Sequence, residues 1–196
     1  MKVIGLTGSI GMGKSTTASL FRRLGIPVYD ADRMVHSLSA KGGKAFPAIV
    51  RTFPEFIKDG TLDRAALGRR AFAEPALLKK LEAILHPRVA AERRRFLSRA
   101  RAARKKMVVL DIPLLFESAG TRGVDVILVV SAPAFLQKAR ALARPGMTPE
   151  KLAAIRARQM SDAEKRRRAD LVLRTGRGKR PVLAQIIGLI ERMGNA

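Results

Sequence analysis

Near the amino terminus, the chain carries an eight-residue pattern that leaves little freedom in how it folds. Residues 8–15 read Gly-Ser-Ile-Gly-Met-Gly-Lys-Ser, which matches G-x-x-x-x-G-K-[ST] in full. A short apolar run at 3–6 precedes the pattern, and residues 14–24 show helical apolar spacing. A strand, a glycine-rich loop and a helix in this order indicate a phosphate-binding loop. An accidental glycine-rich turn is the alternative, but the full pattern and both flanks argue against it.

Each part of this pattern has a physical role in holding phosphate. The glycines let successive backbone N–H groups turn toward an anion, and the helix starting near Gly13 points its N-terminus at the same place. Lys14 can reach the β- and γ-phosphates of a nucleotide, and Ser15 can ligand Mg²⁺. We therefore expect ATP and Mg²⁺ as cofactors. The residues expected to bind the nucleotide are Gly8, Gly11, Met12, Gly13, Lys14, Ser15 and Thr16.

Buried strands alternate with helices along the rest of the chain. The β-branched apolar runs at 107–112 and 124–130 predict parallel strands covered on both faces, and shorter strands are expected at 26–29 and 171–173. The predicted class is α/β, a three-layer P-loop NTPase fold with a five-stranded parallel sheet. We expect one domain over 1–196. Its core comprises 1–40, 106–134 and 169–196, with a helical insertion at about 41–105 and a lid at about 135–168.

The insertion is predicted to be mainly helical. Asp63 can cap a helix that runs to about Phe72, and Pro75 suits the first turn of the next helix, to about Leu85. Pro87 is expected to open a third helix, because proline is tolerated in a first turn. In the predicted lid, Thr148 and Ser161 are plausible N-caps of two further helices.

A phosphate-binding loop alone leaves kinase, GTPase and motor ATPase open. The fourth strand is not followed by a guanine-reading Asn-Lys-x-Asp element, which favours a kinase. Asp30 and Asp32 follow the second strand, at the sheet edge where ligands gather. A carboxylate there can accept the proton of a substrate hydroxyl, or it can cap the following helix. Asp111 ends the third strand and either supports the Mg²⁺ shell or forms a hydrogen-bonded strand end.

Two arginines of the predicted lid are candidates for contacts with a triphosphate. Arg140 and Arg144 lie four residues apart, on or just after the helix that follows the fourth strand, so they can share a face. Guanidinium groups in a lid neutralise charge on the transferring phosphoryl group. The alternative for each is a solvated surface residue. We expect Arg140 to act in catalysis and Arg144 to contact the nucleotide.

The chain is strongly basic, with 39 Lys and Arg against 16 Asp and Glu and a net charge of +23. Such a surface attracts phosphorylated small molecules, nucleic acid or anionic membrane. No aromatic residues interleave with the basic runs, as a base-stacking platform needs. We therefore interpret these runs mainly as solvated helix faces and expect no nucleic-acid partner. The alternative is a nucleic-acid-binding NTPase. Binding of DNA or RNA that persists at physiological salt would support it.

Further features of the composition bound the class of protein. The chain has no cysteine, so disulfides and thiolate metal sites are excluded. It shows neither a signal-peptide pattern nor an apolar stretch long enough to span a bilayer. We expect a cytoplasmic monomer without a membrane partner.

Three short motifs accompany the loop. Asp30-Ala31-Asp32, His86-Pro87 and Pro113-Leu114-Leu115-Phe116-Glu117 occur in this order, with Gln159 and Ala169-Asp170 later in the chain. With these residues, the sequence resembles the dephospho-CoA kinase family over nearly its full length. The resemblance implies transfer of the ATP γ-phosphate to the ribose 3′-hydroxyl of dephospho-CoA, which gives CoA and ADP.

The resemblance also implies roles for parts of the chain. It identifies Asp32 as the base near the acceptor hydroxyl. From the loop motif, we also expect Lys14 to act in catalysis, together with Arg140. It implies that the insertion binds CoA, because its basic surface suits an anionic pyrophosphate. Residues 174–176 read Arg-Thr-Gly where an Asn-x-Gly turn is common, which leaves the adenine-side contacts open. Another small-molecule kinase, such as a nucleoside monophosphate kinase, is the alternative.

Overall fold

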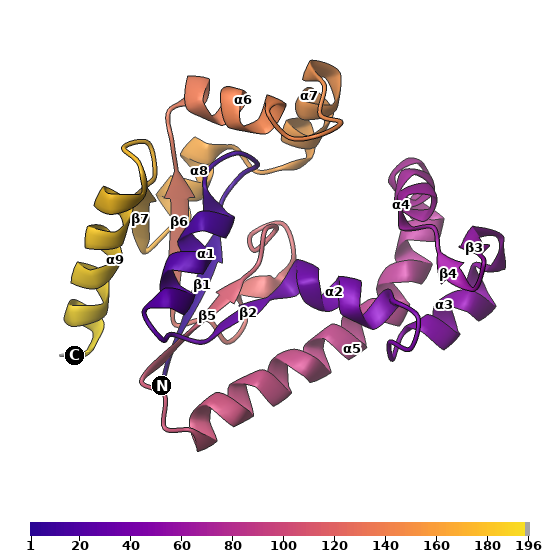
Figure 1. The fold of residues 1–196 in the computed structure, drawn as a ribbon, viewed down its shortest axis with the longest axis horizontal. Coiled ribbons are helices and arrows are strands. Elements are labelled where there is room, and N and C mark those ends of the chain that lie inside the picture. Colours follow the sequence, from indigo (N-terminus) through magenta and orange to yellow (C-terminus); the bar gives the residue numbers. More distant parts are fainter. Residues whose placement is uncertain (195–196) are drawn as a thin grey trace. The chain divides into compact units, whose positions relative to one another are not determined.

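The structure is a computed structural model in which residues 1–194 are described. The chain divides into two compact units (Figure 1). The first unit contains residues 1–30 and the described residues from Ala100 onward, and the second contains Ala31–Arg99. The second unit therefore begins before the predicted start of the insertion at 41 and ends before 105. The division into core, insertion and lid stays a prediction.

Five parallel strands form the sheet of the first unit, in the order β2-β5-β1-β6-β7. β1 lies at the centre, where Ile4 is paired with Val109 of β5 and with Val126 of β6. The central strands are apolar and buried on both faces, as expected of a parallel sheet between helical layers. The predicted five-stranded α/β fold is confirmed. The strand bounds are β1 Lys2–Thr7, β2 Val28–Asp30, β5 Met107–Asp111, β6 Val126–Ser131 and β7 Leu171–Arg174.

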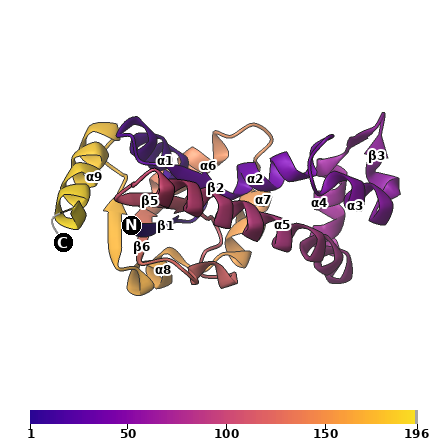
Figure 2. The same ribbon diagram turned by 90° about the horizontal axis from the view of Figure 1, so that it is seen from below.

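Helices cover both faces of this sheet. Figure 2 shows α1 on one side of the sheet and α8 on the other. Phe21 of α1 and Ile186 of α9 are fully buried in the same core as Ile4. Each fully buried side chain of this size contributes about 1.5–3 kcal/mol. The helix bounds are α1 Lys14–Arg23, α6 Ala134–Leu142, α7 Pro149–Arg158, α8 Asp162–Arg168 and α9 Lys179–Gly194, with a 3₁₀ turn, η2, at Ala119–Thr121.

The second unit has its own apolar core, in which Leu38, Ile49, Phe53 and Leu67 are buried together. A small antiparallel pair, β3 with β4, stands among its helices. This hairpin was not predicted, because two-residue strands are too short to show an alternating pattern. The bounds are α2 Ala31–Ser39, α3 Phe46–Thr52, η1 Pro54–Phe56, β3 Ile57–Lys58, β4 Thr61–Leu62, α4 Arg64–Ala73 and α5 Pro75–Ala102.

The predicted helix break before Pro87 is wrong. α5 continues through Pro87 as one helix of 28 residues. An internal proline removes one backbone donor and clashes with the carbonyl four residues earlier. The carbonyl that loses its helical donor at Pro87 is that of Ala83, four residues earlier. One residue on, Arg88 Nη1 donates to the carbonyl oxygen of Ile84 at 2.6 Å. This side-chain hydrogen bond lies beside the proline turn but does not replace the backbone bond that Pro87 removes.

The predicted helix caps are confirmed. Asp63 Oδ1 accepts the N–H of Ala66 at 2.9 Å at the start of α4. Thr148 Oγ1 accepts from Lys151 at α7, and Ser161 Oγ accepts from Glu164 at α8. Each cap satisfies one of the N–H groups that a helix start leaves without a partner. Among helices of the described residues, none has both the length and the apolar character to cross a membrane.

Candidate active site

Glycines shape the loop between β1 and α1 for two reasons. A side chain at Gly8 would collide with β6, since its Cβ would lie 2.4 Å from Val130 Cγ2 and 2.8 Å from the Val130 oxygen. Gly11 has a φ of 77° and Gly13 a φ of 91°, in the left-handed region that glycine adopts without strain. At Gly11 a Cβ would also lie 2.5 Å from the carbonyl oxygen of Gln137. The glycines therefore allow both the turn and the close approach of β6 and α6.

The lysine of the motif is held beside the sheet by an acidic side chain. Lys14 Nζ lies 2.5 Å from Asp111 Oδ1, and the two side chains are 16% and 4% exposed. Asp111 is the last residue of β5, next to β1, which explains why its carboxylate reaches the start of α1. A nearly buried carboxylate requires a cationic partner, and Lys14 supplies it. The structure thus brings together two of the predicted site residues.

Ser15 and Thr16 occupy the first turn of α1 and are exposed. The N-terminus of a helix attracts anions, because its first N–H groups lack helical acceptors and the peptide dipoles add up there. The hydroxyl of Ser15 and the carboxylate of Asp111 are oxygen donors, the type that Mg²⁺ prefers. Mg²⁺ is usually held by one or two such groups together with substrate phosphates. The donor set fits a magnesium–nucleotide complex.

Arg140 is connected to the loop by hydrogen bonds through Thr175, which were not predicted. Its Nη2 donates to the carbonyl oxygen of Thr175 at 3.0 Å. The Thr175 hydroxyl in turn donates to the carbonyl oxygen of Met12 at 2.7 Å. Thr175 is buried just after β7, so it connects the predicted lid helix α6 to the loop. Arg144, by contrast, is exposed beyond the end of α6.

A pocket of about 250 Å³ opens beside the first turn of α1. Gly13, Thr16, Arg140, Thr175 and Lys179 contribute to its lining. Its lining includes Thr175, within the segment 174–176 for which the sequence left the adenine-side contacts open. A larger pocket of about 490 Å³, lined by residues around Pro27, Met107 and Ile190, lies at the amino ends of the strands and holds none of the predicted site residues.

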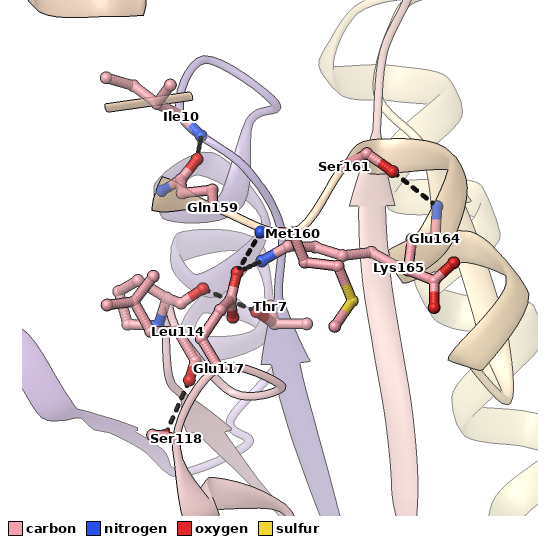
Figure 3. Close-up of polar contacts among 11 residues, drawn as sticks. Thr7, Ile10, Leu114, Glu117, Ser118, Gln159, Met160, Ser161, Glu164 and Lys165 are labelled. Carbon is pink, nitrogen blue, oxygen red and sulfur yellow. Dashed lines mark hydrogen bonds and ion pairs between the residues drawn. The ribbon is translucent and has the colours of Figure 1, made fainter. Parts of the chain in front are cut away.

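Both backbone groups of Ile10 are bound by glutamine side chains. Ile10 N–H donates to Gln159 Oε1 at 3.1 Å, and Gln137 Nε2 donates to the Ile10 oxygen at 2.9 Å (Figure 3 shows the first contact). Sequence reasoning noted Gln159 only as a motif residue and missed Gln137. Gln137 precedes Arg140 by three residues on α6, so the two share one helix face. This spacing was the signal that could have identified it.

The acidic residues after β2 belong to different units. Asp30 ends β2 in the first unit, where it is paired in register with Asp111 and its Oδ2 lies 3.6 Å from Arg22 Nη2. Asp32 lies in the first turn of α2 in the second unit and is exposed. The predicted role of Asp32 as a base therefore stays a prediction.

The fold and this loop together define the class of the protein. A Gly-Lys-Ser loop follows the central strand of a parallel β2-β5-β1-β6-β7 sheet, with an acidic strand end beside its lysine. This is the arrangement of a P-loop kinase. The family model described as dephospho-CoA kinase matches residues 2–179. The chain belongs to the dephospho-CoA kinase family, as the resemblance implied.

Similar proteins agree with this assignment. The dephospho-CoA kinase of Paramagnetospirillum magneticum is 60% identical over 166 residues, which cover 85% of this chain and 78% of the relative. That of Mesorhizobium japonicum is 51% identical over 193 residues, covering 98% and 97% of the two chains. The crystal structure of a Thermus thermophilus protein matches with a TM-score of 0.86 at 38% identity. The match covers 97% of this chain and 96% of the Thermus chain.

Proposed function

We propose that this protein transfers the γ-phosphate of ATP to the ribose 3′-hydroxyl of dephospho-CoA, giving CoA and ADP. One observation carries the proposal: a glycine-rich loop, a helix N-terminus and the Lys14–Asp111 pair converge at one place in a member of this family. The acceptor follows from the family, because another P-loop kinase would share this loop. Phosphoryl transfer depends mainly on positioning and on charge stabilisation, which such a loop supplies.

The proposed roles follow the chemistry of each group. The loop amides and Lys14 bind the phosphates, and Arg140 neutralises charge on the transferring group. Ser15 and Asp111 would hold Mg²⁺, which offsets the charge of the phosphates when bound. Asp32 would accept the proton of the acceptor hydroxyl. Arg144 would join the nucleotide site from the end of α6.

We propose a monomer that acts in the cytoplasm on a small-molecule substrate, without a membrane or nucleic-acid partner. The helical insertion would bind the CoA moiety through its basic surface, since the pyrophosphate of dephospho-CoA is anionic.

A panel of acceptors tests the activity. Purified protein with Mg-ATP is expected to phosphorylate dephospho-CoA and to leave nucleoside monophosphates unchanged, as measured by ADP formation and product mass. Lys14→Ala and Asp32→Asn are each expected to lower turnover at least ~10²-fold, because they remove a charge-stabilising group and a base.

Asp30→Asn is the matched control for the proposed base. It makes the same chemical change two residues earlier, on a carboxylate that lies near Arg22. A smaller effect of this variant than of Asp32→Asn is expected. Phosphorylation of nucleoside monophosphates with no reaction of dephospho-CoA would show that the acceptor is wrong. A larger effect of Asp30→Asn would transfer the role of base to Asp30.

A further inference from the structure

The first unit contains an ion pair with a buried lysine, to which the proposed reaction assigns no role. The Lys165 side chain on α8 is 0% exposed, and its Nζ lies 2.8 Å from Glu117 Oε1. Glu117 stands in the loop after β5 and its side chain is 18% exposed. Burying a lysine is costly unless an acidic group lies beside it. The buried ammonium group of Lys165 therefore indicates a specific structural role, unlike the many exposed cations of this chain.

The same carboxylate holds the segment between α7 and α8. Met160 N–H donates to Glu117 Oε1 at 2.8 Å, so one oxygen atom serves both Lys165 and the backbone. The preceding residue, Gln159, accepts the N–H of Ile10 in the nucleotide loop. Figure 3 shows these contacts in one view, with Lys165 reaching to Glu117 and Gln159 reaching to Ile10. The ion pair is thus one residue away from a direct contact with the loop.

A further hydrogen bond closes these contacts into a ring. The Thr7 hydroxyl donates to the carbonyl oxygen of Pro113 at 2.9 Å, at the point where β1 enters the loop. The turn that carries Glu117 is stabilised from within, since the Ser118 hydroxyl donates to the Leu114 oxygen at 2.7 Å. The ring joins three segments that are far apart in sequence. They are the nucleotide loop, the loop after β5 and the segment between α7 and α8.

We propose that Gln159 and the Glu117–Lys165 pair are positioning residues for the nucleotide loop. The pair fixes residues 159–160, and Gln159 then holds the N–H of Ile10, whose carbonyl oxygen is held by Gln137. An oriented Ile10 peptide presets the loop for the phosphates, because the following amides turn with it. None of the three residues needs to touch the acceptor. The inference rests on the proposed function only in that the loop binds ATP.

Gln159→Met tests the contact with the loop. Methionine has a similar length but cannot replace the amide oxygen, so the variant removes one hydrogen bond with little change in volume. We expect the Kd and KM for ATP to rise roughly three- to tenfold, the value of one hydrogen bond. The KM for dephospho-CoA is expected to stay unchanged, and Tm to shift by less than about 4 °C. Calorimetric titration with Mg-ATP gives the Kd without any acceptor.

A second pair of variants tests the ion pair without leaving a buried charge. In a Lys165→Met background, Glu117→Gln keeps an oxygen for Met160 N–H, whereas Glu117→Ala removes it. Relative to the unsubstituted protein, we expect the Kd for ATP to change by no more than about twofold in Lys165→Met/Glu117→Gln. In Lys165→Met/Glu117→Ala we expect it to be roughly three- to tenfold higher. Arg167→Met is the matched control, since it removes an exposed cation from the same helix. This control is expected to leave ATP binding unchanged.

Two results would overturn the positioning role. One is parent-like ATP affinity in Gln159→Met, and the other is equal affinity of the Glu117→Gln and Glu117→Ala versions. An equal rise of both KM values would also contradict it, because that pattern indicates general loosening of the fold. Failure to phosphorylate dephospho-CoA would refute the proposed function instead, and the ATP titrations would still decide on the positioning role.

Discussion

Asp111 is the residue on which the charge balance at the loop depends. It is 3% exposed at the end of β5, and Lys14 lies within 2.5 Å of it. Moving a carboxylate out of water costs several kcal/mol unless a cation and hydrogen bonds compensate. The same oxygen atoms are of the type that holds Mg²⁺. Asp111 therefore either acts on the metal, or acts only by holding Lys14, and a substitution separates the two roles.

Asp111→Asn is expected to raise the Mg²⁺ concentration that gives half-maximal rate by about tenfold or more, because an amide oxygen replaces a charged ligand. The measurement is turnover against Mg²⁺ at saturating ATP and dephospho-CoA. Asp30→Asn, the same change on the neighbouring strand, is expected to leave this dependence unaltered. A variant with lower turnover but parental Mg²⁺ dependence would confine Asp111 to holding Lys14.

At the scale of the element, α5 shows that a local rule can be overridden inside a long helix. Pro87 has twelve helical residues before it and fifteen after it, within Pro75–Ala102. The helix continues because its other hydrogen bonds and its packing in the core of the second unit outweigh the one backbone hydrogen bond lost at Ala83. Leu85, next to this turn, is one of the buried residues of that core. Pro75, in contrast, stands in the first turn of the helix, where a backbone N–H would have no helical acceptor.

Pro87→Ala is expected to stabilise the protein against unfolding by about 1–2 kcal/mol, since the restored N–H outweighs the greater freedom of the unfolded chain. Pro75→Ala on the same helix is the matched control, and its expected change is within about 0.5 kcal/mol. Denaturant unfolding followed by helical circular dichroism measures both. Equal effects of the two variants would show that Pro87 is fully compensated in α5.

Local patterns predicted most elements, and long-range contacts account for what they missed. The loop motif, the apolar runs of the individual strands and the caps at Asp63, Thr148 and Ser161 each depend on residues within a few positions of one another. The contact of Ile10 with Gln159 joins residues 149 apart, and that of Thr175 with Met12 joins residues 163 apart. No periodicity encodes such pairs, so the hydrogen bonds that hold the loop became visible only in the folded chain.

At the scale of the whole molecule, an excess of positive charge opposes folding. The net charge of +23 causes self-repulsion in a compact state. Several of the few acidic side chains accept hydrogen bonds from cationic neighbours. A hydrogen bond from Lys44 lowers the pKa of Glu92, and one from Arg167 lowers the pKa of Glu164. Burial raises the pKa of Glu117, but hydrogen bonds from Lys165 and Met160 outweigh it, so its pKa also lies below the usual range.

These lowered pKa values fix the sign of the acid response. Between the lowered pKa and the ordinary value of about 4.3, the unfolded chain binds protons that the folded chain does not. The stability that these carboxylates contribute is therefore fully present above the ordinary value and is lost as pH falls through the lowered values. Each proton taken up also adds to the positive charge. We expect acid unfolding to begin near pH 4 at low salt, as followed by circular dichroism.

Salt shows which electrostatic effect dominates, because it weakens both the repulsion and the exposed ion pairs. About 1 M NaCl reduces the screening length to roughly 3 Å, which suppresses repulsion between distant cations. Most pairs here involve an exposed cation, such as Arg167 with Glu164, and exposed pairs are worth little. Repulsion among the excess cations should therefore be the stronger of the two effects. We expect NaCl to raise Tm at pH 7 and to shift acid unfolding to lower pH, with chloride used because sulfate and phosphate would bind the loop itself. A fall in Tm with NaCl at pH 7 would show that the ion pairs outweigh the repulsion.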